Sequence, residues 1–173
     1  MARNIEDYFP PIKEDGLVTA ENATIGGTLT ITGATTLTGG AGAVASTGAI
    51  TSSAPTGGGI GYATGAGGAV TQATNRTTGV TLNKLAGQIT TNNASLAAEA
   101  SADFTVTNTT VAIGDVVVVS IQSGSNGGGT IVSVSTVAAG SFAIRVHNGN
   151  VAAGTAETGA IIINFAVIKS VAA

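Results

Sequence analysis

The sequence predicts an all-β protein: a C-terminal β-sandwich or jelly roll, preceded by an extended N-terminal arm and a short β-repeat stalk. No stretch longer than one turn has the i, i+3, i+4, i+7 spacing of an amphipathic helix. Thr, Val, Ile, Gly and Asn, which favour strands and turns, dominate throughout. Because the 173 residues include only 4 Phe, 2 Tyr and no Trp, we expect neighbouring subunits to contribute to stability. A short helix at residues 95–99 is the one helical alternative.

Composition excludes several kinds of partner and site. Six Lys and Arg residues cannot form the basic face that nucleic-acid binding requires, because each neutralised phosphate needs a cationic side chain. The longest apolar runs, such as Val116–Val119, hold about four residues, whereas a membrane span needs roughly 18. With no cysteine and one histidine, the chain is expected to bind no metal and no cofactor.

Residues 1–16 are predicted to form an extended arm. Seven of the fifteen charged residues lie in the first 21 positions, and Tyr8, Phe9 and Ile12 gather around Pro10 and Pro11. Two prolines stiffen the backbone and cannot join a central strand. One interpretation is a disordered terminus. The other is a segment that becomes ordered against a partner, which accounts for the grouped apolar side chains.

Residues 17–55 are predicted to form a stalk of short strands separated by glycine turns. Single aliphatic residues recur in two sets spaced by six, and alternation with Thr adds Leu29 to the first set. Such units bury too little apolar surface to be stable alone, and a threefold-symmetric stalk would supply the missing contacts. A flexible linker is the alternative. The predicted stalk contacts are Ile25, Leu29, Ile31, Leu37, Val44 and Ile50.

Residues 56–68 are rich in glycine and are predicted to form a hinge or a tight turn. They lack the Gly-Lys-Ser/Thr ending of a phosphate-binding loop and the spacing of a dinucleotide site.

Residues 69–173 are predicted to form the sandwich domain, because six segments place apolar residues at period two. Asn126–Gly129 and Asn148–Asn150 have the composition of hairpin turns. Val116–Val119 and residues 161–163 are apolar on both faces, so we expect another subunit to cover at least one sheet. The six predicted strands are Val80–Leu82, Phe104–Val106, Val117–Ile121, Val132–Val134, Phe142–Val146 and Ile161–Val167.

Few residues could carry out catalysis. His147 is the only imidazole, and alternation places it on the face of Arg145, opposite Ile144 and Val146. A Ser-His-Asp triad would need it near Asp103 or Asp115, and no Gly-x-Ser-x-Gly turn surrounds any serine. A glycosidase pair would also have to come from those aspartates or from Glu99 and Glu157, without aromatic platforms for a sugar. We therefore expect that the protein is not an enzyme.

Three segments resemble a domain of tailed-bacteriophage virion proteins: residues 61–84, Phe104–Asn108 and Asn164–Lys169. The most distinctive part is Thr-Gln-x-Thr-x-Arg-Thr-Thr-Gly-Val-Thr at residues 71–81. The resemblance covers roughly residues 60–173 and implies a structural protein of the particle, usually trimeric. It carries no catalytic residue onto this chain.

Within that class, a small arm, stalk and domain in 173 residues fit a capsid decoration (cement) protein on the outer surface of the head. The major capsid protein would be the partner, bound through Tyr8, Phe9, Pro10, Pro11 and Ile12, and the chain would form a homotrimer. A tail or head fibre that attaches to the host surface is the alternative. A small enzyme domain would instead require a pocket with converging polar groups.

Overall fold

The computed structural model describes residues 59–62, 65–126, 129–152 and 154–170. The predicted arm (1–16) and stalk (17–55) lie outside these residues. The described part is all-β, and none of it is helical. Its eight strands are β1 (Ala69–Thr71), β2 (Val80–Thr81), β3 (Ala86–Thr90), β4 (Ser101–Thr107), β5 (Val116–Ser123), β6 (Thr130–Ala138), β7 (Ser141–Asn148) and β8 (Ile162–Ile168).

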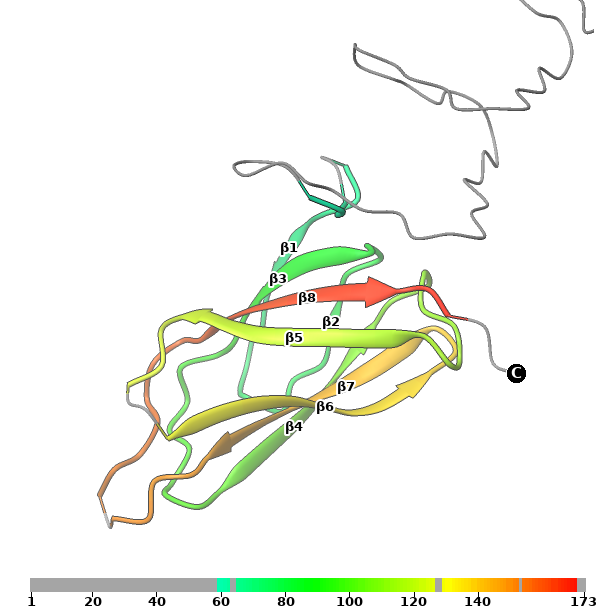
Figure 1. Cartoon of the computed structure of the whole chain (residues 1–173). Helices are drawn as coiled ribbons and strands as arrows, with labels where there is room; N and C mark the ends of the chain where they lie inside the picture. The colour runs from blue at the N-terminus through cyan, green and yellow to red at the C-terminus, as the bar shows by residue number, and fades with distance from the viewer. Residues whose placement is uncertain (1–58, 63–64, 127–128, 153, 171–173) are drawn as a thin grey trace, which may run out of the picture. The chain divides into compact units, whose positions relative to one another are not determined.

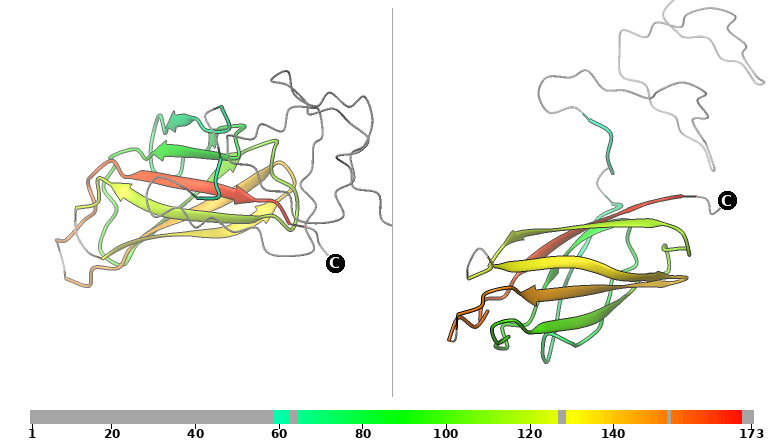
Figure 2. Two further views of the ribbon diagram at one scale, coloured as in Figure 1. Left: turned by 45° about the horizontal axis from the view of Figure 1, so that its top comes forward. Right: turned by 60° about the horizontal axis from the view of Figure 1, so that its bottom comes forward.

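The strands form two mixed sheets of four that face each other in a sandwich-like arrangement, visible edge-on in Figure 1. Sheet A has the order β1-β3-β8-β5 and sheet B the order β2-β4-β7-β6. In each sheet one outer pair is parallel, β1 with β3 and β2 with β4, and the other pairs are antiparallel. Figure 2 shows the two layers from two further directions.

The chain changes sheet at almost every connection between these strands. From β1 to β6 it alternates between sheet A and sheet B, and it crosses again from β7 to β8. Only β6 and β7 are consecutive neighbours within one sheet, joined by a tight turn in which Gly140 has a φ of 78°. This alternation also accounts for the parallel pairs, because β1 and β3, like β2 and β4, are separated by two crossings, and two reversals restore the strand direction.

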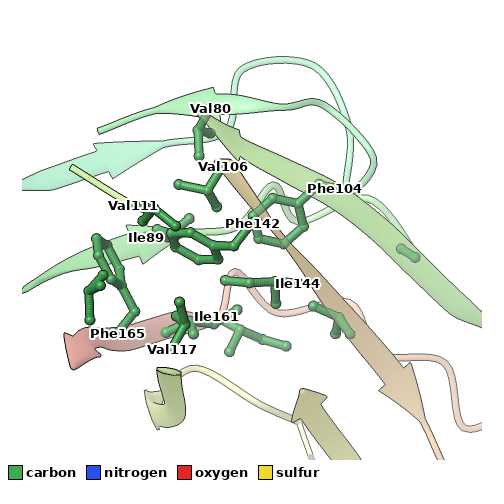
Figure 3. Close-up of a cluster of buried hydrophobic side chains, with 14 of the residues drawn as sticks. Val80, Ile89, Phe104, Val106, Val111, Val117, Phe142, Ile144, Ile161 and Phe165 are labelled. Carbon is green, nitrogen blue, oxygen red and sulfur yellow. The ribbon is translucent and has the colours of Figure 1, made fainter. Parts of the chain in front are cut away.

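The core lies between the sheets and is filled from both of them (Figure 3). In β4 and β7 the alternating pattern buries every second residue, such as Phe104 and Ile144, as period-two sequences dictate. Phe142 of sheet B and Phe165 of sheet A meet with ring centroids 5.3 Å apart and planes tilted by 54°. This tilted contact is a favoured aromatic geometry and joins the two layers directly.

Each of the six predicted strands is present. The sequence pattern missed β1 and β3, which hold one large aliphatic residue each, Val70 and Ile89. The helix considered at residues 95–99 is not formed, because Leu96 pairs with Glu157 in an antiparallel bridge.

The prediction of hairpin turns at Asn126–Gly129 and Asn148–Asn150 is wrong. Residues 124–129 connect β5 of sheet A to β6 of sheet B, and residues 149–161 connect β7 of sheet B to β8 of sheet A. Both segments therefore cross between the layers. Turn-forming residues indicate where a strand ends, but they do not indicate which sheet the next strand enters.

The end of β5 lies very close to the chain that leads into β8. Gly124 has a φ of 91°, and a Cβ atom there would lie 2.0 Å from the carbonyl oxygen of Ala160. Gly140 also has a positive φ, but a Cβ atom there would have no neighbour within 4 Å. Substituting each of these two glycines therefore distinguishes the free-energy cost of a left-handed backbone from the cost of close packing.

We predict that Gly140→Ala lowers the free energy of unfolding by about 1–2 kcal/mol, the usual cost of a left-handed alanine. Gly124→Ala should cost about 1–3 kcal/mol more, because overpacking is added to the same backbone strain. Urea unfolding of both variants measures the difference. Equal losses would show that the Gly124 and Ala160 backbones are not in contact.

Candidate functional site

The distinctive segment at residues 71–81 contains buried polar side chains that bind neighbouring loops through hydrogen bonds. Gln72 is buried directly after β1, and its amide nitrogen donates to the carbonyl oxygens of Arg76 and Thr78 at 3.0 and 2.8 Å. Its amide oxygen accepts the backbone N–H of Asn92 at 3.0 Å. One side chain thus closes the loop between β1 and β2 and ties it to the segment that follows β3.

Arg76, in the same loop as Gln72, binds segments that are more distant in the sequence. It is only 3% exposed, and its guanidinium donates to the carbonyl oxygens of Ala94, Glu157 and Gly159 and to the Thr91 hydroxyl. Burial lowers the pKa of Arg76 from its usual value, and the charge of Glu157 opposes that shift. An arginine suits this position because its donors form a fixed planar fork that reaches several acceptors at once.

Glu157, 1% exposed, is the buried carboxylate of this cluster. Its side-chain oxygens accept hydrogen bonds from three segments: Thr130 Oγ1 at 2.6 Å, the Gly159 N–H at 2.9 Å, and Ser125 Oγ and the Asn126 N–H at 3.0 Å. Burial opposes ionisation, but these donors together outweigh it and lower the pKa of Glu157 below its ordinary value. The carboxylate is therefore ionised and fully engaged at neutral pH.

We call the pair Arg76 and Glu157, with the loops that they bind, the crossover clamp. Its polar atoms are occupied by internal partners, and each buried side-chain nitrogen and oxygen of the described residues has a hydrogen-bond partner. The described residues also hold no cluster of His, Asp and Glu that could bind a metal ion. The hydrogen bonds of the clamp join the connections by which the chain passes from one sheet to the other.

The outer face of sheet B is polar. Register pairs Asp103 of β4 with Arg145 of β7, and the guanidinium donates to the carboxylate through two bonds of 2.8 Å. These bonds lower the pKa of Asp103 and raise that of Arg145. One pair further along, Ser101 Oγ lies 3.0 Å from His147 Nδ1. His147 is on the outer face beside Arg145, as its alternation predicted.

This serine–histidine contact does not complete a triad. The third member of a triad is a carboxylate that orients the imidazole. Asp103 is bound by Arg145, and the other aspartate considered, Asp115, is bound by the Ala112 N–H and the Lys169 ammonium. Those two contacts lower the pKa of Asp115. Period-two alternation could have placed Ser101 and His147 on one face, but their cross-strand register is visible only in the structure.

The outer face of sheet A changes from polar to apolar along its strands. Beyond the first row of this face, in which half-buried Ile162 pairs with Thr90 and Ser123, three cross-strand rows follow along β8. The rows are Ser120, Asn164 and Gln88, then Val118, Ala166 and Ala86, and last Val116 and Ile168. Val116 and Val118 are 50% exposed and Ile168 is 53% exposed, although each is aliphatic. The structure thus places apolar side chains on the open face of β5, and the expectation that another subunit covers a sheet stays a prediction.

The chain that precedes β1 is attached to this apolar end. The Tyr62 hydroxyl donates to the carbonyl oxygen of Val167 in β8. Ile60, Gly61, Tyr62 and Ile168 line a pocket of about 320 Å³, and Ile60 itself is 74% exposed. We call the five exposed apolar residues Ile60, Tyr62, Val116, Val118 and Ile168 the outer patch.

The outer patch is the strongest candidate for a binding surface among the described residues. The sequence singled out the valine run of β5, but it missed Ile60, Tyr62 and Ile168 as exposed residues. Their exposure follows from register with β5 and from the path of the incoming chain, which alternation alone does not reveal. The predicted capsid-binding residues (Tyr8–Ile12) and the six stalk residues (Ile25–Ile50) lie outside the described residues.

Comparisons with protein-family models, curated proteins and solved structures find no match to the chain. Within the described ranges, no helix is long and apolar enough to span a membrane.

We predict that Glu157→Gln lowers the free energy of unfolding at pH 7 by about 1.5–3 kcal/mol, the usual contribution of a hydrogen bond to a charged group. The new amide NH₂ would also face the donors that now bind the carboxylate. A carboxyl whose pKa is depressed on folding stabilises the protein above its unfolded pKa of about 4.3, and that contribution is lost as the pH falls through the folded value. The difference between wild type and variant should therefore shrink below about pH 4. Urea unfolding at several pH values measures it.

Asp103→Asn is the matched control, because Asp103 belongs to a half-exposed pair on the outer face of sheet B. It should change the free energy of unfolding by about 1 kcal/mol at most. A loss for Glu157→Gln no greater than that of Asp103→Asn would contradict the crossover clamp.

Proposed function

We propose that the chain is a structural protein of a tailed-bacteriophage particle, a decoration protein that binds the outside of the head and stabilises the capsid lattice. The observation that carries this proposal is the outer patch. It is an exposed apolar surface on a domain whose described buried charges are bound in structural contacts. A surface of this kind marks a contact with other protein chains.

The arrangement of the chain supports the same function. The segment with the strongest phage resemblance, residues 71–81, contains Gln72 and Arg76, whose hydrogen bonds maintain the fold. A resemblance centred on structural residues fits a shared scaffold with an assembly role. The proposal includes the finer features of the sequence analysis: a jelly-roll topology, a trimer, a capsid-anchoring arm and a non-enzymatic role. The major capsid protein is the proposed partner.

We predict that deleting residues 2–16 leaves the domain folded but weakens binding to purified phage heads at least about tenfold. The reason is that an aromatic anchor such as Tyr8 or Phe9 typically contributes more than the 1.4 kcal/mol that a factor of ten requires. Co-sedimentation of full-length and truncated protein with heads that lack the protein measures the loss.

The control is the double variant Lys13→Ala and Glu14→Ala, which keeps the apolar group of the arm and should bind heads like wild type. Circular dichroism and thermal unfolding verify that both changed proteins are folded. Full-strength binding of the truncated protein would overturn the anchoring role of the arm. Attachment of the full chain to host cells, with no binding to heads, would favour the fibre function instead.

A further inference from the structure

We infer that the outer patch on sheet A is the surface through which copies of this chain contact one another, with the polar outer face of sheet B turned to solvent. The occupant of the patch is thus the equivalent region of a neighbouring copy. This inference takes from the proposed function only the oligomeric stalk, and it does not require binding to a capsid.

The contrast between the two outer faces is the first argument. Sheet B presents Ser101, Asp103, Arg145 and His147, which are paired with each other across β4 and β7. Ile131 is its one large exposed aliphatic residue. Sheet A presents Val116, Val118 and Ile168 together at one end, and its polar residues, such as the bonded Gln88 and Gln122, lie at the other. An apolar surface gathered at one end of one sheet indicates a protein contact there.

The path of the chain is the second argument, because it selects a copy of the same protein as the occupant. Tyr62 holds the incoming chain against β8 at the apolar end of sheet A. Tyr62 lies seven positions after Pro55, where the predicted stalk ends, and an extended chain covers at most about 25 Å over that length. In copies joined through residues 17–55, Tyr62 of each copy would therefore lie within that reach of the predicted stalk's end.

Joining of the copies through the stalk also explains how a patch of only five side chains can form a stable contact between them. Five side chains are far fewer than the 20–30 residues a side that a stable interface between free proteins usually needs. A stalk that ties the copies together makes the second contact intramolecular, with an effective concentration in the millimolar range for a short linker. The patch need only be complementary to itself or to the adjoining part of the next copy.

The experiment uses the complete chain and exploits its lack of cysteine. Val118→Cys places a single thiol in the outer patch, and Ile131→Cys places one on sheet B as the matched control. The native residues are similarly exposed, at 50% and 57%. Reaction rates with a maleimide are measured on the folded proteins, together with molar mass by light scattering. Thermal unfolding verifies that both variants are folded.

We expect an oligomer in which Cys introduced at Val118 reacts at least about tenfold more slowly than Cys introduced at Ile131, because a buried site reacts only when the contact opens. Equal rates would overturn the inference. Protection in a protein that is monomeric would also overturn it, since the chain's own N-terminal residues would then cover the patch. Both measurements are made without phage heads, so failure to bind heads would refute the proposed function and leave this inference intact.

Discussion

The fold depends on holding the connections that carry the chain from one sheet to the other. Almost every pair of consecutive strands is divided between the two sheets, so few neighbouring strands can stabilise each other by forming a hairpin. The crossings must therefore be fixed at the ends of the domain. Arg76 and Glu157, 81 residues apart, bind the connections β1–β2, β5–β6 and β7–β8 to one another. Burying both charges is tolerated because each is surrounded by hydrogen-bond partners.

Strand position was predictable where side-chain alternation was strong, as in Phe104–Val106 and Phe142–Val146. It was not predictable for β3, where Ala86, Gly87 and Gln88 offer little apolar contrast and the strand is defined by its pairing with β8. The connections between strands were predicted less well than the strands themselves. Asn126–Gly129 has hairpin composition, yet β5 pairs with β8 and β6 with β7. Pairing across such sequence distances depends on core packing and on the crossover clamp, and neither has a local sequence signal.

The candidate sites were only partly predictable for the same reason. Glu157 was a possible catalytic carboxylate in the sequence, but Thr130, Asn126 and Gly159 surround it with donors and give it a structural role. The exposed apolar character of β5 could be deduced from four consecutive valines. The contributions of Ile168 and Ile60 could not, because one depends on register across β5 and β8 and the other on where the incoming chain meets the sheet.

The composition predicts that neighbouring subunits contribute to stability, which stays a prediction, and the structure shows which side chains fill the core of the single chain. Phe104, Phe142 and Phe165 fill the centre of a core in which Ile89, Ile144 and Val167 have no exposed surface. Phe142 and Phe165, one from each sheet, meet in this core with their ring centroids 5.3 Å apart. Since this core is closed within one chain, the outer patch is not required to complete the fold. Its exposed aliphatic surface is therefore free for the proposed contact between copies, which would leave the outer face of sheet B to solvent.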